Sequence, residues 1–534
     1  MATAKTEDFE DCTAFLGYFG FFQILIIVML SVTGIPTGYM PMLVVFVSDT
    51  PEHHCKEWIN STHNSSSIGP DSCSRYKGDD SWKETEELSN DTEQCLDGWV
   101  YSTDRYTSTI VSEWDLVCEN AWKVPFSTSL YFVGVLIGCL ICGHLSDRWG
   151  RKPVLFSILF LQAVTPLIQA ASVSWIMFCI LNCLRGLGQS SQNIVSLTLG
   201  TEILRKSARV TFSSLGLSGG FGIGYALLPA FAYFIRGWRM LLVASAIPPL
   251  VLLLFWWVIP ESPRWLLQKG RVEEAELIIR KAAKMNRVPA PDVIFRTGES
   301  LELMQNKHEE KQKYTYMDLI RTTNMRNMTI LSSIIWISGV MVYTGLSLNT
   351  SNLDGNPYLN CFFSAAIDLV GYVFIWLVIN RAPRPTLLCI TMMLSGIMLL
   401  VTLLVPEDMH VMFLVFALMG KMGSTAAYSF AWVFSAELMP TVVRNMGLGF
   451  SSTASRISIV ICPYIVYIGI YSKMLPYIIF GTFSIVGAAV SMLLPDTRNS
   501  KLPDLISEAR PIRRYCCLKE DQQTTQMQLQ AENI

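Results

Sequence analysis

The sequence predicts an all-α membrane protein whose twelve transmembrane helices form two pseudo-symmetric six-helix halves. The composition is the first reason: 51% of the 534 residues are hydrophobic and only 16% are charged, whereas soluble domains carry roughly 25% charged residues. The second reason is a series of apolar runs long enough to cross a bilayer. The third is an internal repeat, in which related segments lie 235 residues apart.

Twelve apolar runs follow one another along the chain, and a helix needs about 20 such residues to cross the hydrocarbon core. They cover residues 19–47, 124–145, 154–173, 175–199, 210–235, 239–260, 327–349, 359–380, 386–405, 410–434, 447–471 and 475–494. Lipid offers the backbone no hydrogen-bond partner, so each run is expected to be helical. The first run is too long for a signal-peptide core and follows an acidic leader, so it is expected to be a span.

The polar segment 48–122 is predicted to be an extracellular loop. It carries 16 acidic against 5 basic residues, together with four cysteines and three sequons. In an oxidising compartment two disulfides are expected, with three pairings open, among Cys55, Cys73, Cys95 and Cys118. The expected glycosylation sites are Asn60, Asn64 and Asn90.

The second polar segment, 261–326, is predicted to be a cytoplasmic linker. It holds 13 basic against 10 acidic residues, and the short links "SDRWGRK", "TEILRKSAR" and "NRAPR" are also basic. Because basic loops stay in the cytoplasm, both termini are expected inside. Within the linker, "GRVEEAELIIRKAAKMN" at 270–286 has a helical pattern and predicts a surface helix.

These limits divide the chain into five parts. They are a cytoplasmic N-terminus (1–18), an N-terminal half with its extracellular loop (19–260), the linker (261–326), a C-terminal half (327–494) and a cytoplasmic tail (495–534). The tail is polar and rich in glutamine, which predicts disorder. Its adjacent Cys516 and Cys517 are either palmitoylated or reduced thiols.

The internal repeat follows the fourth run of each half. The segments "GTEILRKSARVTFSSLG" and "SAELMPTVVRNMGLGFS" align Glu202 with Glu437 and Arg209 with Arg444, both at an offset of 235 residues. A weaker echo relates "GRKP" to "APRP" at an offset of 232 residues. Duplicated six-helix halves are the plan of the major facilitator fold, in which the substrate site lies between the halves.

Several motifs resemble the organic cation, anion and zwitterion transporter family of the major facilitator superfamily. The stretch "GHLSDRWGRKP" is similar to the cytoplasmic signature of the superfamily, and "PESPRWL" and "STASR" are similar to family motifs. The stretches "CLDGWVYSTDRYTSTIVSEWDLVCENAWKVP" and "AELMPTVVRNMGLGFSSTASR" resemble the organic cation/carnitine subfamily most. The resemblance covers nearly the whole chain. It implies a plasma-membrane transporter of small organic cations and zwitterions such as carnitine, without a cofactor and with sodium as the candidate co-transported ion.

Charged residues at the cytoplasmic helix ends are candidate gating groups. They are Asp147, Arg148, Arg151, Glu202, Arg209, Glu437 and Arg444. Asp147 is expected to pair with Arg209, Arg151 and its basic neighbours are expected to meet Glu202, and Glu437 with Arg444 would repeat the arrangement. We interpret them as a latch that holds the outward-facing state and breaks when the halves rock. The alternative is a positive anchor that only sets the orientation.

Ionisable residues inside spans mark the candidate substrate site, because each costs about 2.5–3.5 kcal/mol at mid-membrane. They are Arg185, Asp368, Lys421 and Arg456. The planar fork of arginine suits a carboxylate, and the resemblance implies that Arg456 binds the anionic end of the substrate. Asp368 either attracts a substrate ammonium or balances Arg456. Lys421 is either a functional charge or a side chain that snorkels to the interface.

The resemblance adds further candidate contacts. Gln189 matches a glutamine that resembles a carnitine contact of the subfamily. Aromatic faces recognise quaternary ammonium groups, and the candidates at matching positions are Tyr225, Tyr343, Tyr428 and Trp432. For each of them, ordinary packing is the alternative.

Three departures from the subfamily keep other functions open. Thr37 stands where sodium-using relatives carry asparagine, Arg185 where the subfamily usually has an uncharged residue, and Thr344 where close relatives place an aromatic one. An organic anion exchanger anchored by Arg456 and Arg185 and a sodium-independent organic cation uniporter are therefore the alternatives. No HExxH, GxxxxGK[ST] or GxSxG motif is present, so neither an enzyme nor a metal site is expected. No nucleic-acid partner is expected either.

Overall fold

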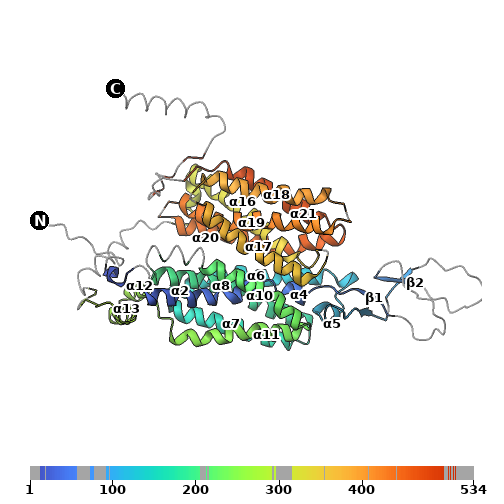
Figure 1. Ribbon diagram of the computed structural model, residues 1–534, viewed down its shortest axis with the longest axis horizontal. Coiled ribbons are helices and arrows are strands. Elements are labelled where there is room, and N and C mark those ends of the chain that lie inside the picture. The colour runs from blue at the N-terminus through green and yellow to red at the C-terminus, as the bar shows by residue number, and fades with distance from the viewer. Residues whose placement is uncertain are drawn as a thin grey trace, which may run out of the picture.

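In the computed structural model, each of the twelve apolar runs coincides with a helical segment (Figure 1). Among the described residues, ten segments are long and apolar enough to cross a membrane, from Phe21–Val47 to Met446–Ile470. The apolar 17-residue α21 and the 29-residue α8 complete the set of twelve. The structure describes residues 12–17, 20–56, 72–76, 92–95, 97–204, 208, 212, 216–291, 294–295, 315–353, 355–379, 381–406, 408–440, 442–497, 503, 506, 509 and 511–512.

The first six spans form one bundle. They are α2 (Phe21–Thr33) with α3 (Ile35–Tyr39) and α4 (Val44–Val47), α6 (Lys123–Trp149), α7 (Arg151–Ala170), α8 (Trp175–Ile203), α10 (Leu217–Phe234), and α11 (Trp238–Leu252) with η4 (Leu253–Trp257). Within this bundle, which we call the N half, α8 packs against α6 and α7, and α10 packs against α3.

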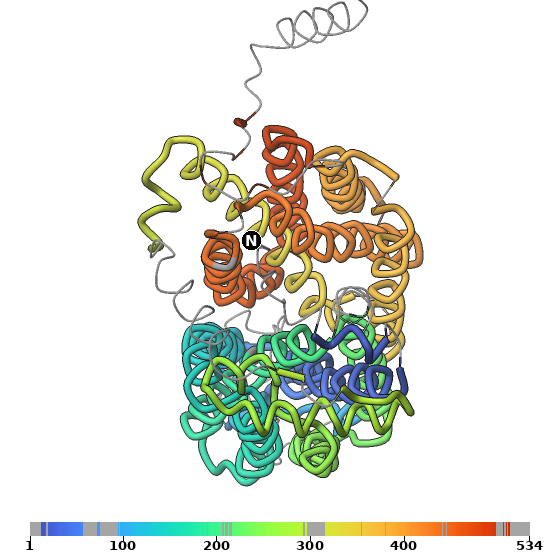
Figure 2. The backbone as a smooth tube through the Cα atoms, turned by 90° about the vertical axis from the view of Figure 1, so that its left-hand side faces the viewer, coloured from blue at the N-terminus to red at the C-terminus, as the bar shows by residue number. Residues whose placement is uncertain are grey.

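The last six spans form the second bundle, which we call the C half. They are α16 (Thr323–Leu348), α17 (Pro357–Val378), α18 (Arg384–Val401) with η5 (Thr402–Leu404), α19 (His410–Leu438), α20 (Arg444–Tyr467) with η6 (Ile468–Ile470), and α21 (Leu475–Ser491). The two bundles lie side by side (Figure 2). They meet where α6 packs against α20 and α10 packs against α17, and we call this contact the seam.

Shorter elements mark the two ends of the bundle. One end, the loop end, carries β1 (His53–Cys55), β2 (Ser74–Tyr76), β3 (Thr92–Gln94), β4 (Trp99–Tyr101), α5 (Ile110–Glu113) and η2 (Cys118–Asn120). The opposite end, the linker end, carries η1 (Ala14–Leu16), α12 (Pro263–Gln268), α13 (Val272–Asn286) and α15 (Asp318–Arg321) (Figure 1). The predicted surface helix at 270–286 corresponds to α13.

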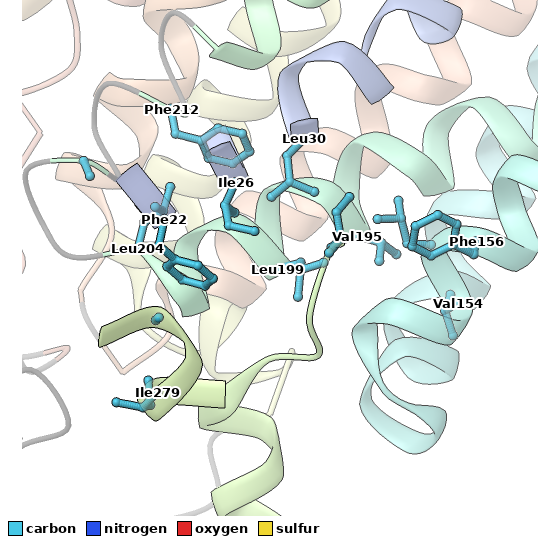
Figure 3. Close-up of a cluster of buried hydrophobic side chains, with 14 of the residues drawn as sticks. Phe22, Ile26, Leu30, Val154, Phe156, Val195, Leu199, Leu204, Phe212 and Ile279 are labelled. Atoms are coloured by element: carbon cyan, nitrogen blue, oxygen red, sulfur yellow. The ribbon is translucent and has the colours of Figure 1, made fainter. Parts of the chain in front are cut away.

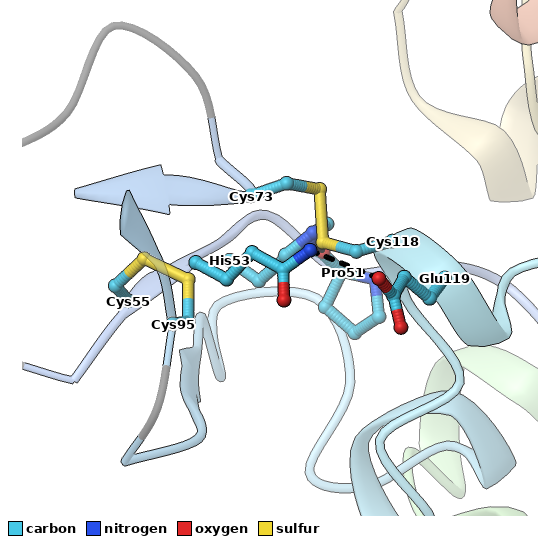
Figure 4. Close-up of a disulfide and its surroundings, with 8 residues drawn as sticks. Pro51, His53, Cys55, Cys73, Cys95, Cys118 and Glu119 are labelled. Carbon is cyan, nitrogen blue, oxygen red and sulfur yellow. Dashed lines mark hydrogen bonds between the residues drawn. A yellow bond between two sulfur atoms is a disulfide. The ribbon is translucent and has the colours of Figure 1, made fainter. Parts of the chain in front are cut away.

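Two disulfides brace the loop end. Strand β1 pairs antiparallel with β4, and β2 pairs antiparallel with β3. Of the three open pairings, the structure has Cys55 bonded to Cys95 and Cys73 bonded to Cys118 (Figure 4). The glycosylation sites predicted at Asn60, Asn64 and Asn90 and the tail cysteines Cys516 and Cys517 lie outside the described residues.

Helix α13 packs beneath the N half because its apolar face joins that half's core. Ile279 of α13 belongs to the same buried cluster as Phe22 and Ile26 of α2 and Leu199 of α8 (Figure 3). At its end, Asn286 Oδ1 accepts a hydrogen bond from the Phe22 backbone N–H at 2.8 Å. An otherwise orphaned N–H at the start of α2 is thereby satisfied.

Candidate functional site

A buried ion pair lies in the middle of the C half. Lys421 Nζ on α19 is 3.4 Å from Asp368 Oδ2 on α17, and their side chains are 2% and 0% exposed. The Asp368 carboxylate also accepts hydrogen bonds from Thr425 Oγ1 at 2.7 Å and from the Tyr343 hydroxyl at 3.1 Å. Lys421 therefore does not snorkel, and the described partner of Asp368 is Lys421 rather than Arg456, as one alternative had it.

Tyr225 of α10 brings the N half to this pair. Its hydroxyl lies 3.1 Å from Ser364 Oγ of α17 and accepts a hydrogen bond from Lys421 Nζ at 3.4 Å. Lys421 Nζ also donates to Ser364 Oγ. The ammonium lies 4.6 Å from the ring centroid of Tyr225 and 5.6 Å from that of Tyr343. Two of the aromatic faces expected for a substrate cation are thus occupied by the protein's own lysine.

Arg456 of α20 lies at the other contact between the halves. It is half-buried, and its guanidinium is hydrogen-bonded to Cys139 of α6 and to Tyr428 of α19. The Tyr428 ring stacks on Tyr343 with the centroids 5.8 Å apart and the planes at 21°. Tyr428 therefore connects Arg456 to the surroundings of the buried pair.

The remaining aromatic candidate, Trp432, has a different environment. Its ring packs edge-on against Trp336 at 4.5 Å, and the residue is 37% exposed. This contact favours ordinary packing for Trp432.

Arg185 of α8 is buried with an exposed fraction of 2%. Its guanidinium lies over the ring of Tyr131 on α6, 5.1 Å from the centroid. Among the described residues, Nε and Nη1 of Arg185 have no hydrogen-bond partner. The sequence marked Arg185 as a departure from its relatives, and the structure places it beside the seam.

Gln189 and Thr37 lie together one turn further along α8. Gln189 Nε2 donates to the Thr37 carbonyl at 3.4 Å. The Thr37 hydroxyl donates to the Gly34 carbonyl at 2.6 Å and lies 3.3 Å from Asn193 Oδ1. The hydroxyl of Thr37 is thus engaged within the N half.

At the linker end, Arg151 is the centre of the charged cluster. Its guanidinium donates to both carboxylate oxygens of Glu202, at 2.9 and 3.0 Å, and to the Ser146 carbonyl at 3.0 Å. Its backbone N–H donates to Glu261 at 2.9 Å. Asp147 pairs with Arg151 at 2.9 Å, whereas the expected partner, Arg209, lies outside the described residues.

The C half repeats this cluster around Arg384. Its guanidinium donates to both carboxylate oxygens of Glu437, each at 3.0 Å, and to the Ile379 carbonyl. Its backbone N–H donates to Asp496 at 3.1 Å. The expected pairing of Glu437 with Arg444 is therefore wrong for the described contacts, since Arg444 Nε donates to the Met439 carbonyl at 3.3 Å. The echo at an offset of 232 is also one residue short, because Arg151 matches Arg384.

Each of these bidentate pairs joins helices of a single half. Arg151 and Glu202 belong to α7 and α8, and Arg384 and Glu437 belong to α18 and α19. The two pairs do not cross the seam, so rocking of the halves would not break them. The latch hypothesis is thus left to Arg148, which is exposed, and to Arg209 and Arg444, for which the described contacts show no ion pair across the seam.

A cavity of about 1240 Å³ opens at the loop end between the two halves. Its lining includes Val44 of α4 and Thr128 of α6 from the N half, and Phe413 of α19 and Pro463 of α20 from the C half. Nearby, His53, Cys73 and Cys118 lie together, but the two sulfurs are joined in a disulfide. Without thiolates this cluster is no metal site.

Sequence reasoning missed several residues of the site. Ser364, Thr425, Tyr131 and Cys139 are uncharged, so only the packing of the helices singles them out. Arg384 carried a signal, since "RAPRP" follows the eighth run as "GRKP" follows the second, but the one-residue slip in the alignment hid it.

Twelve helices in two six-helix halves, with ionised groups along the seam, define a membrane transporter of the major facilitator class. Comparison with known proteins agrees. Residues 81–505 match the model of the family "Sugar (and other) transporter". An inward-open structure of the xylose transporter XylE from E. coli superposes with a TM-score of 0.64 at 15% identity, covering 91% of this chain and 100% of XylE.

Closer relatives narrow the class. The human organic cation/carnitine transporter 2 is 44% identical over 526 residues, which cover 94% of each chain. Mouse solute carrier family 22 member 21 is 42% identical over 532 residues, covering 95% of this chain and 94% of that one. A Drosophila organic cation transporter protein is 36% identical over 521 residues, 94% of each chain. The chain belongs to the solute carrier 22 family, with the organic cation/carnitine transporters, and is a transporter rather than an enzyme.

Proposed function

We propose that this protein carries small organic cations and zwitterions, such as carnitine, across the plasma membrane by alternating access. The observation that carries the proposal is the position of Arg456, which sits at the seam between a thiol of the N half and a tyrosine of the C half. A guanidinium there can bind a carboxylate, while the faces of Tyr428 and its neighbours suit a quaternary ammonium. The names of the relatives support the same class of substrate.

The orientation is part of the proposal. The acidic, disulfide-braced loop end would face outward and the basic linker end inward, with both termini in the cytoplasm. The cavity at the loop end would then be the entry for substrate from outside.

Uptake of radiolabelled carnitine and tetraethylammonium tests the proposal. In cells that express the protein, both substrates are expected to enter faster than in control cells. Arg456→Gln should reduce carnitine uptake at least tenfold, because the carboxylate loses a charge-assisted hydrogen bond. Tetraethylammonium uptake should persist in this variant. Equal loss of both substrates at normal surface abundance would contradict the assigned role of Arg456.

The energy source separates the alternatives in the same assay. Replacing sodium tests coupling to that ion, which Thr37 leaves open. A monovalent cation gains roughly 2.3 kcal/mol per 100 mV of inside-negative potential, so a uniporter should respond to the membrane potential without sodium. An anion exchanger should instead require an internal anion and should reject tetraethylammonium.

A further inference from the structure

The charges along the seam do not balance within the described part of the protein. Of the ionisable groups in the middle of the spans, Lys421 is neutralised by Asp368. Arg185 and Arg456 have no acidic side chain within ion-pairing distance among the described residues. Two uncompensated guanidiniums at membrane depth are costly, so the site is suited to an anion that enters from outside the protein.

Unpartnered polar atoms gather at the same place. In the described structure, Nε and Nη1 of Arg185, Nε of Arg456 and the hydroxyl of Tyr131 are buried without a hydrogen-bond partner. Tyr131 lies under the Arg185 guanidinium and interacts electrostatically with Arg185 and Arg456 alike. Guanidinium groups can only donate hydrogen bonds. The cluster therefore lacks an acceptor, and a carboxylate supplies two oxygens with about four lone-pair positions.

Two glycines build this arrangement. A Cβ at Gly186 would collide with the Tyr131 carbonyl, and one at Gly134 would collide with the Cys183 carbonyl. Without side chains at these positions, α6 and α8 approach closely. Arg185 directly precedes Gly186, so the close contact holds its side chain against Tyr131.

Helix α6 connects the cluster to the C half. It packs against α20, and Ser129 Oγ donates to the Val460 carbonyl of α20 at 2.8 Å. Arg456 itself reaches Cys139 of α6. One guanidinium thus comes from each half, and both face the same helix.

The cavity at the loop end leads toward the cluster. Thr128 and Pro463 line this cavity. Thr128 lies three residues before Tyr131 and Pro463 seven residues after Arg456, spacings that place each pair on one helix face. A solute in the cavity therefore meets Tyr131 and Arg456 as it moves deeper along these faces.

We propose that Arg185, Tyr131 and Arg456 form one carboxylate-binding site shared by the two halves, and that a substrate needs a carboxylate to bind this protein tightly. The proposal deepens the proposed function, on which it rests only for placing the substrate in the seam. Arg185 and Tyr131 are assigned here as specificity-determining residues. Zwitterions and carboxylates would bind well, and simple cations would bind poorly.

Three matched probes and purified protein test the site without requiring transport. Carnitine carries both charges, its methyl ester lacks the carboxylate, and 3-hydroxybutyrate lacks the ammonium. Their Kd values would be measured by ligand-induced thermal stabilisation of the detergent-solubilised full chain. Arg185→Gln should raise the Kd of carnitine and of 3-hydroxybutyrate about tenfold or more, and should change the Kd of the methyl ester less than about twofold.

Two milder variants keep the test valid if Arg185→Gln does not fold. Arg185→Lys keeps the charge but loses the planar fork, and Tyr131→Phe keeps the ring but loses the hydroxyl. Each should reduce the preference for carnitine over its methyl ester by about threefold or more. An unchanged preference in every folded variant, or an equal loss for all three probes, would overturn the site.

The outcomes also separate this site from the proposed function. Protein that binds 3-hydroxybutyrate in an Arg185-dependent manner but does not take up carnitine or tetraethylammonium would retain the site and refute the proposed function. Carnitine uptake with a Kd that ignores Arg185 and Tyr131 would do the reverse. Failure of the wild-type protein to bind either carboxylate probe would also overturn the site.

Discussion

Lys421 Nζ lies 3.4 Å from Asp368 Oδ2 and 4.6 Å from the centroid of the Tyr225 ring, so a lysine of the C half fills a cation-binding niche that includes a tyrosine of the N half. The carboxylate in this niche already has a cation and two hydroxyl donors. An incoming ammonium would have to displace Lys421 to reach Asp368. The niche therefore works against simple cations.

Removing one member of this buried pair should be more harmful than removing both. Asp368→Asn should destabilise the protein by about 3–5 kcal/mol, because it leaves the Lys421 charge uncompensated. The double variant Asp368→Asn with Lys421→Gln should recover most of the loss. Thermal unfolding of the purified proteins measures both effects. If the double variant is no more stable than Asp368→Asn, the two residues are not coupled as described.

Freeing Asp368 should also change selectivity. Lys421→Gln leaves the Asp368 carboxylate without its cation, so a substrate ammonium can take that place. The ratio of tetraethylammonium to carnitine uptake should rise about tenfold or more in this variant. The variant Ser364→Ala, which removes a hydrogen-bond partner of Lys421 but not its charge, is the matched control and should leave the ratio near that of the wild type.

Arg384 should be as important for stability as Arg151, although only Arg151 belongs to the conspicuous charged motif. Either Arg→Gln change removes a bidentate pair whose arginine is nearly buried, and each should cost about 1.5–3 kcal/mol. Arg148→Gln removes the same charge from an exposed position and should change stability by less than about 0.5 kcal/mol. Melting temperatures of the three variants provide the comparison. An Arg384→Gln protein as stable as Arg148→Gln would contradict the repeated cluster.

The two disulfides can be tested by peptide mapping and by paired substitutions. Non-reducing digests should yield peptides that link Cys55 to Cys95 and Cys73 to Cys118. The second bond closes a loop of 45 residues, and the chain-entropy model assigns about 4 kcal/mol to such a loop. Cys73→Ser, Cys118→Ser and the double variant should therefore be destabilised to the same extent. A double variant less stable than either single one would show another pairing.

Asp49, just beyond the first span, should make stability depend on pH. Burial raises the pKa of this carboxyl from 3.8 to about 6, although the Tyr106 hydroxyl, which donates to it at 2.7 Å, opposes the shift. The folded state therefore binds a proton more tightly than the unfolded state, and its stability falls as pH rises from about 4 to about 6. Asp49→Asn should remove this loss. The melting temperature of the variant relative to wild type should rise across that window and level off above it, and a constant difference would exclude Asp49 as the cause.

Some parts of this structure could be predicted from the sequence and others could not, for physical reasons. The spans and α13 follow from apolar runs and a helical pattern, which are local properties. The partner of Asp368 is Lys421, 53 residues away on a helix two spans later, and only the packing of α17 against α19 brings them together. Tyr131 and Cys139 are neutral residues in apolar runs, so no local pattern distinguishes them from packing residues.

The seating of α13 has a consequence for measuring motion. Among the described elements α13 contacts α12, α2 and η1, so it belongs mechanically to the first bundle. A spin label at Lys284, on the last turn of α13, would travel with that bundle as a fixed pointer. Its separation from a second label near the end of α21 would then report the tilt of one bundle against the other during each transport cycle.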